Sequence, residues 1–232
     1  MKKTLIALGT LLLTTNATAA GGDDPMLAKV MIDRFERQHT AGDDPLMLEA
    51  DVWIGRDLHK LWFKTEVERV GAETEEAEIQ ALYSRAIAPY WDLQVGWRHD
   101  ALPKPERDWL AVGFNGLAPY WFEIDAAAFV GGNGQVAARF TGEYEWLFTQ
   151  RLILSPELEM NLHGKDDPAT GVGAGVSDLE LGLRLRYEMV REFAPYVGIN
   201  WKKKFGDTAD FARDHGEDPD DVQVVVGFRA WF

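Results

Sequence analysis

Apolar and polar residues alternate along the last eleven residues of the chain. From Val222 to Phe232 every second residue is apolar, and the positions between them include Gln223, Gly227 and Arg229. A period of two residues is typical of a β-strand that has one face in an apolar environment and the other in a polar one. The end of the chain is therefore predicted to be a strand with two unlike faces.

Similar alternation divides most of the chain into segments of roughly ten residues. In one of them, Leu181 and Leu183 alternate with Glu180 and Arg184. The first and sixth segments alternate less regularly. We expect twelve strands, at residues 27–37, 46–56, 59–70, 75–86, 90–99, 106–117, 120–130, 135–146, 150–162, 178–190, 194–204 and 222–232.

An even number of such strands is typical of bacterial outer-membrane barrels, and the aromatic terminus Phe232 resembles their assembly signal. No segment beyond the amino-terminal region approaches the ~20 apolar residues of a membrane helix. We predict an all-β fold, an antiparallel transmembrane β-barrel in the outer membrane. Short turns would face the periplasm, and longer loops, notably 163–177 and 206–221, would face outside.

The amino-terminus predicts export. Lys2 and Lys3 precede an apolar run over residues 5–13, and Ala17-Thr18-Ala19 supplies small residues for cleavage. This pattern is typical of a secretory signal peptide, and its apolar run is too short to span a membrane. We expect a signal peptide at 1–19, a short segment at 20–26 and the barrel at 27–232.

Composition narrows the class further. Aromatic residues make up 12% of the chain, with 9 Trp, and the triplet Ala-Pro-Tyr occurs at 88–90, 118–120 and 194–196. Proline suits a strand start, and the neighbouring aromatic rings are expected to form a girdle at the membrane interface. The chain has no Cys and a net charge of -14, which excludes thiolate chemistry and disfavours nucleic acid as a partner.

Alternation also predicts a charged lumen. The inward positions hold both signs with acid in excess, and this excess favours cations over anions in any open path. The charged residues with inward parity are Glu49, Asp51, Lys60, Lys64, Glu66, Glu76, Glu78, Asp92, Arg98, Glu123, Asp125, Arg139, Glu143, Glu145, Arg151, Glu157, Glu159, Glu180, Arg184, Arg186, Glu188, Lys202 and Arg229.

Several segments resemble the copper resistance protein B family of outer-membrane proteins: 30–36, 53–55 with 61–66, 88–98, 144–152 and 195–201. The resemblance implies a barrel that binds copper ions and helps to move them across the outer membrane, beside a periplasmic multicopper oxidase. It also implies contact with outer-membrane lipid and lipopolysaccharide. Many members carry a segment rich in Met and His before the barrel, whereas residues 20–26 contain Met26 alone.

Imidazole and thioether groups are the candidate copper ligands. The predicted topology places His39, His99, His163 and His215 at the outer rim and His59 at a periplasmic turn. Histidine is also common in polar loops without any metal. Met31 and Met47 have inward parity on adjacent strands, beside Asp33, Glu49 and Asp51, where they could form a transit site for copper or fill gaps.

Two other functions remain open at this stage. The barrel could be a passive or structural pore without metal specificity. It could also be a lipid hydrolase, since Ser177 and His163 fall in the same outer loop, but no nucleophile-elbow or oxyanion motif accompanies them. We therefore expect a barrel that is not an enzyme, with the oxidation state and direction of the copper left open.

Overall fold

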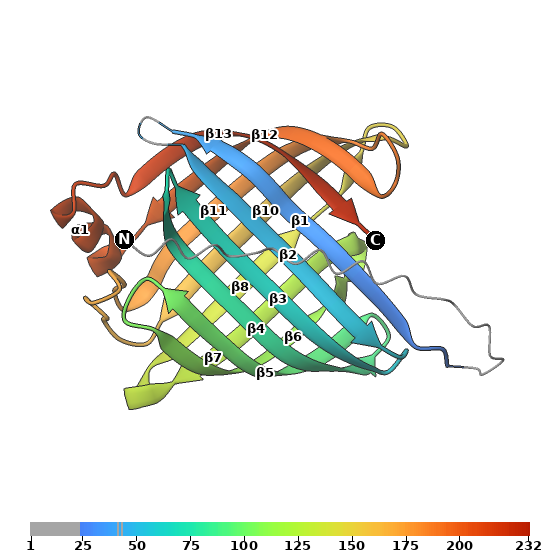
Figure 1. Ribbon diagram of the computed structural model, residues 1–232, viewed down its shortest axis with the longest axis horizontal. Coiled ribbons are helices and arrows are strands. Elements are labelled where there is room, and N and C mark those ends of the chain that lie inside the picture. Colours follow the sequence, from blue (N-terminus) through green and yellow to red (C-terminus); the bar gives the residue numbers. More distant parts are fainter. Residues whose placement is uncertain (1–23, 41, 43) are drawn as a thin grey trace.

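The computed structural model describes residues 24–40, 42 and 44–232, so the predicted signal peptide lies outside the described residues. The chain winds through one antiparallel sheet (Figure 1). Its strands are β1 (Leu27–His39), β2 (Pro45–Gly55), β3 (His59–Val70), β4 (Glu73–Ala88), β5 (Trp91–Leu102), β6 (Arg107–Ala118), β7 (Phe122–Gly131), β8 (Val136–Glu143), β9 (Trp146–Leu147), β10 (Leu152–His163), β11 (Gly175–Tyr187), β12 (Phe193–Lys204) and β13 (Asp220–Trp231).

The sheet closes on itself. β13 pairs with β1, with Phe228 opposite Phe35 and Val225 opposite Gln38. Closure leaves no open sheet edge, so backbone N–H and C=O groups find partners without water. β8 and the two-residue β9 both pair with β10 and together form one wall strand, interrupted at Tyr144 and Glu145. The wall therefore has the twelve strands that the alternation predicts.

The two ends of the barrel differ, as expected. At the end that holds the carboxy-terminus, strands are joined by tight turns, including a 3-10 turn at Pro119–Trp121 (Figure 1). At the opposite, outer end lie the longer connections 164–174 and 205–219. The connection 205–219, expected to be a loop, contains a short helix, α1 (Gly206–Asp214). This helix buries Thr208, Ala209 and Ala212. No helix among the described residues is long and apolar enough to cross a membrane.

Aromatic side chains gather at the periplasmic turns. Tyr90, Tyr120 and Trp121 have positive φ angles and are 70% exposed or more, as a membrane-interface girdle requires. The expectation was wrong for the third Ala-Pro-Tyr triplet. Tyr196 lies within β12, is buried, and donates a hydrogen bond to Glu36 inside the barrel. The parity of β12, which turns even-numbered residues inward, explains the difference.

A β-bulge explains the irregular first strand. The register of β1 shifts after Ile32 against both β2 and β13. The inward positions are therefore odd-numbered up to Asp33 and even-numbered from Arg34 onward, so these two neighbours both line the lumen. Bulges insert one residue and re-aim the side chains that follow. Arg34 and Glu36 consequently point inward, although neither belongs to the set predicted from simple alternation.

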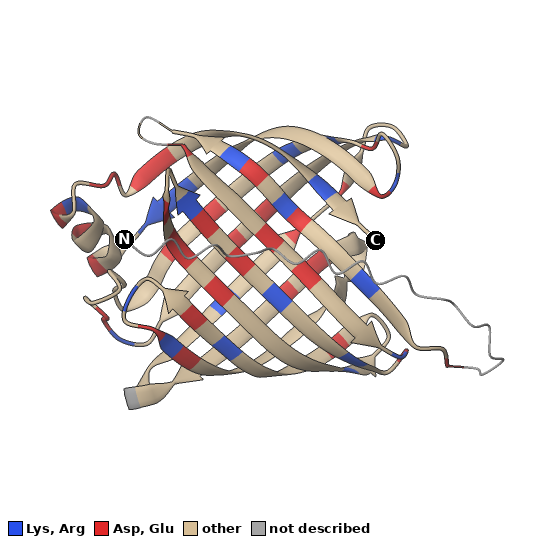
Figure 2. Cartoon of the chain, in the orientation of Figure 1, with Lys and Arg blue, Asp and Glu red and all other residues tan. Residues whose placement is uncertain are grey.

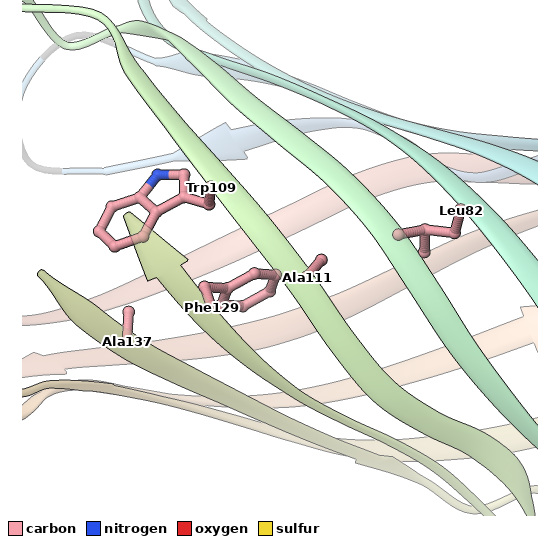
Figure 3. Close-up of a cluster of buried hydrophobic side chains, with 5 residues drawn as sticks. All are labelled: Leu82, Trp109, Ala111, Phe129 and Ala137. Atoms are coloured by element: carbon pink, nitrogen blue, oxygen red, sulfur yellow. The ribbon is translucent and has the colours of Figure 1, made fainter. Parts of the chain in front are cut away.

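The sixth strand alternates poorly because part of the lumen wall is apolar. Leu82, Trp109, Ala111, Phe129 and Ala137 form a buried cluster on β4, β6, β7 and β8 (Figure 3). The Arg98 guanidinium lies over the Phe129 ring, 4.5 Å from its centroid. One side of the barrel interior is thus filled by packed apolar side chains, and the charged groups occupy the rest.

The outward face of the wall is apolar. On β11 and β13, Leu181, Leu183, Val224 and Val226 are exposed and alternate with buried inward residues, as predicted. Leu152 and Leu154 alternate in the same way with the buried Ile153 and Ser155 on β10.

We predict that a charge on this face destabilises the barrel according to its depth. Leu183→Arg, at mid-strand, should lower the free energy of unfolding by about 2–4 kcal/mol, because the guanidinium must enter the hydrocarbon. Val222→Arg, at the outer end of β13, should cost about 0–1 kcal/mol. Urea titration of unfolding in lipid vesicles measures both. Equal costs at the two positions would contradict the assignment of the lipid face.

Candidate functional site

The lumen is the candidate site because charged residues extend along the strands through the full height of the barrel (Figure 2). Their inward parity, set by strand alternation and by the bulge of β1, brings residues from distant strands together. Lys64 on β3, for example, pairs with Asp125 on β7. Side chains of opposite wall segments therefore meet inside the barrel.

Four arginines form ion pairs across the lumen, and we call them the arginine layer: Arg34, Arg98, Arg139 and Arg184. Arg184 makes a two-pronged pair with Glu36, with both N–O distances at 2.9 Å, and its third nitrogen lies 2.9 Å from Glu157. Glu36 is completely buried and also accepts the Tyr196 hydroxyl. A buried carboxylate needs this many partners, because an unpaired charge would carry a large desolvation cost.

The other arginines continue the layer across the barrel. Arg139 on β8 lies 3.0 Å from Glu78 on β4 and 3.5 Å from Glu159 on β10. Arg98 shares Glu78 at 2.8 Å, and Arg34 shares Glu159. One continuous chain of ion pairs thus connects β5, β4, β8, β10, β1 and β11, and it reaches β12 through the pair of Glu180 with Lys202.

An inner cavity of about 280 Å³ adjoins the arginine layer. Ten carboxylates and six basic side chains line it, so its lining carries a net negative charge. Trp62, Gln94 and Ser155 also line this cavity, and their buried atoms Nε1, Nε2 and Oγ have no hydrogen-bond partner among the described residues. The cavity therefore combines an excess of carboxylates with unpaired buried polar groups in its wall.

A second cavity of about 150 Å³, the vestibule, lies at the periplasmic end. Its charge balance is reversed, since four basic residues and two carboxylates line it. Met31, Arg186 and Arg229 line both cavities, so the two spaces adjoin at these side chains. The charged lining residues of the vestibule are Lys29, Arg186, Arg191, Arg229, Glu145 and Glu188.

The two candidate methionines do not lie together. Both point inward on adjacent strands, but Met31 is opposite Asp51 whereas Met47 is opposite Glu36. Positions 47 and 51 of β2 are four residues apart, which corresponds to about 13 Å along a strand. Met47 is 3% exposed and lines neither cavity, whereas Met31 lines both. Met31 therefore lies at the two cavities, whereas Met47 is a packed side chain away from them.

The four candidate histidines occupy the outer end but stay apart. His39 ends β1, His99 lies near the outer end of β5, His163 ends β10 and His215 follows α1. No group of three or more His, Asp or Glu side chains among residues 24–40, 42 and 44–232 is arranged to hold a metal ion. The predicted rim position is correct, and a single shared site is not formed.

In three of these imidazoles, the Nδ1 atom lies close to a hydrogen-bond acceptor of the protein. The Nδ1 atoms of His39 and His99 lie 2.9 Å from the carboxylates of Asp44 and Asp108, and Nδ1 of His215 donates to the Phe211 carbonyl at 2.7 Å. The hydrogen bond from His39 holds the pKa of Asp44 below its ordinary value. An imidazole whose Nδ1–H is held by an acceptor presents Nε2 outward, as metal-binding histidines usually do.

The serine and histidine considered for hydrolysis do approach each other. His163 Nδ1 lies 3.3 Å from Ser177 Oγ. Ser177 is fully buried, and its hydroxyl is already committed to the Asn161 carbonyl and the Asp178 carboxylate. The pair therefore faces away from the bilayer lipid that a membrane lipase would have to reach.

Fold and lumen together define an outer-membrane β-barrel of the porin type. The solved structure of the NanC porin matches with a TM-score of 0.59 and 11% identity, covering 88% of this chain and 99% of that one. The KdgM porin matches with a TM-score of 0.54 and 12% identity, covering 89% and 99%. At these identities the likeness concerns the fold alone.

Sequence comparison gives the family. The model for the copper resistance protein B precursor matches residues 26–232. Copper resistance protein B of Escherichia coli is 45% identical over 203 residues, which are 88% of this chain and 69% of the relative. A homolog from Pseudomonas syringae pv. tomato is 42% identical over 210 residues, 90% of this chain and 71% of the relative. The chain belongs to the copper resistance protein B family.

Proposed function

We propose that this barrel binds copper ions and helps to carry them across the outer membrane as part of copper resistance. The observation that carries the proposal is the position of Met31. Its thioether lines both the acidic inner cavity and the vestibule, and no other methionine of the described residues lines either. Thioether sulfur favours Cu(I) over hard cations such as Ca²⁺, so Met31 would select copper where the two cavities adjoin.

The rest of the lumen supports passage of a cation. The excess of carboxylates in the inner cavity attracts positive ions, and carboxylate oxygens can replace part of a cation's hydration shell. Outer histidines with outward Nε2 atoms would raise the local copper concentration at the rim. On the other side, the basic vestibule faces the periplasm, where a multicopper oxidase would exchange copper with the barrel.

Copper flux through the purified barrel tests this function. In proteoliposomes, the parent barrel should pass copper and retain small sugars. Met31→Leu should reduce copper flux relative to Ca²⁺ leakage, because the selecting sulfur is lost. Met47→Leu is the matched control and should behave as the parent does, since its thioether lines neither cavity.

Either substitution nearly conserves side-chain volume and should destabilise the barrel by less than about 1.5 kcal/mol. Equal copper flux in both variants and the parent would show that Met31 packs in the barrel but does not select copper. Sugar leakage from vesicles that hold the parent would instead identify a passive pore.

A second prediction concerns capture at the rim. Replacing His39, His99, His163 and His215 together by Ala should weaken copper binding in isothermal titration without unfolding the barrel. His59→Ala, at the periplasmic turn, is the control and should change little. Binding should also weaken in acid, because a protonated imidazole cannot ligate a metal. A quadruple variant that binds copper like the parent would exclude this role.

A further inference from the structure

Arg34 occupies an unusual place in the lumen. Its side chain is 7% exposed and pairs with four glutamates from three strands of the wall. Nη1 lies 3.1 Å from Glu180, and Nη2 lies 3.3 Å from Glu157 and 3.8 Å from Glu159. Nε donates to Glu49. The guanidinium therefore sits inside a ring of carboxylates, which we call the glutamate ring: Glu49, Glu157, Glu159 and Glu180.

Three members of the glutamate ring also pair with basic residues other than Arg34. Glu157 also pairs with Arg184, Glu159 with Arg139 and Glu180 with Lys202. Glu49 has no second basic partner among the described residues. These three basic groups also pair with Glu36, Glu78 and Glu68 outside the ring, so the position is acidic without the Arg34 guanidinium at its centre.

The bulge of β1 produces this arrangement. It turns Arg34 inward immediately after the inward Asp33, so the guanidinium reaches β10 and β11 from β1. A regular strand would have turned Arg34 outward, toward lipid. Arg34 also lines the inner cavity, so an ion on the proposed route would pass its guanidinium.

We propose that Arg34 is a specificity-determining residue of the lumen, a tethered counter-ion that holds the glutamate ring closed to simple monovalent cations. The inference rests on the proposed transport of copper. A potassium ion gains little by displacing a guanidinium of the same charge that already makes several charge-assisted hydrogen bonds. A divalent ion, or one that forms coordinate bonds with its ligands, binds the carboxylates more strongly and therefore displaces the guanidinium more readily.

Potassium conductance in planar lipid bilayers tests the proposal without using copper. The parent barrel should conduct potassium poorly. Arg34→Ala should raise the conductance several-fold, and the reversal potential in a potassium chloride gradient should move toward that of potassium, because the glutamate ring remains. Arg37→Ala is the matched control. It removes the same charge from the same strand, but Arg37 is exposed at the outer rim, where it pairs with Asp44, and its conductance should stay at the parent value.

Arg34→Lys provides a second test in case Arg34→Ala does not fold. It keeps the charge, but a single ammonium cannot replace the guanidinium fork, so its conductance should lie between those of the parent and Arg34→Ala. Folding of each variant is verified by the heat-dependent gel shift of the intact barrel.

The proposal is overturned if folded Arg34→Ala, or folded Arg34→Lys where the alanine variant does not assemble, conducts potassium no better than the parent. It is also overturned if the added conductance is anion-selective. Failure of copper flux in the parent would leave these potassium results unchanged, so the two proposals can fail separately.

Discussion

Charged groups inside a barrel must find partners of opposite sign, and the interior of this protein is organised by that constraint. Glu36 is fully buried and is stabilised by both prongs of Arg184 and by the Tyr196 hydroxyl. Removing one partner of such a pair leaves a buried charge uncompensated, which is far more costly than losing an exposed pair. The arginine layer therefore fixes the relative positions of strands that share no backbone hydrogen bonds, and three of its members line the acidic inner cavity.

The wall itself follows from the membrane. Lipid offers no hydrogen bonds, so the sheet closes, and closure assigns alternate residues to lipid and lumen. The bulge of β1 is the one place in that strand where two neighbours share the lumen, and it delivers Arg34 to the glutamate ring. A local backbone irregularity thus determines which charge stands at the centre of the glutamate ring.

Much of this could be predicted from residue order alone. Strand number and the two faces follow from a period of two, because alternation is a local property, and the assignment of the ends follows from the lengths of the connections. The inward position of Arg34 and Glu36 could not be predicted, since a bulge resets parity without a strong composition signal. The adjacent charges Asp33 and Arg34 were the available hint. Likewise, alternation placed Met31 and Met47 inside, but only the strand register showed that they lie apart.

We propose that copper crosses the barrel through the lumen and binds beside Met31 on the way. Diffraction at the copper absorption edge from crystals of the barrel soaked in a copper salt tests it most directly. Anomalous density should appear inside the barrel, next to the Met31 sulfur where the inner cavity and the vestibule adjoin. Density confined to the outer histidines or to the lipid-facing surface would contradict a lumenal path for copper.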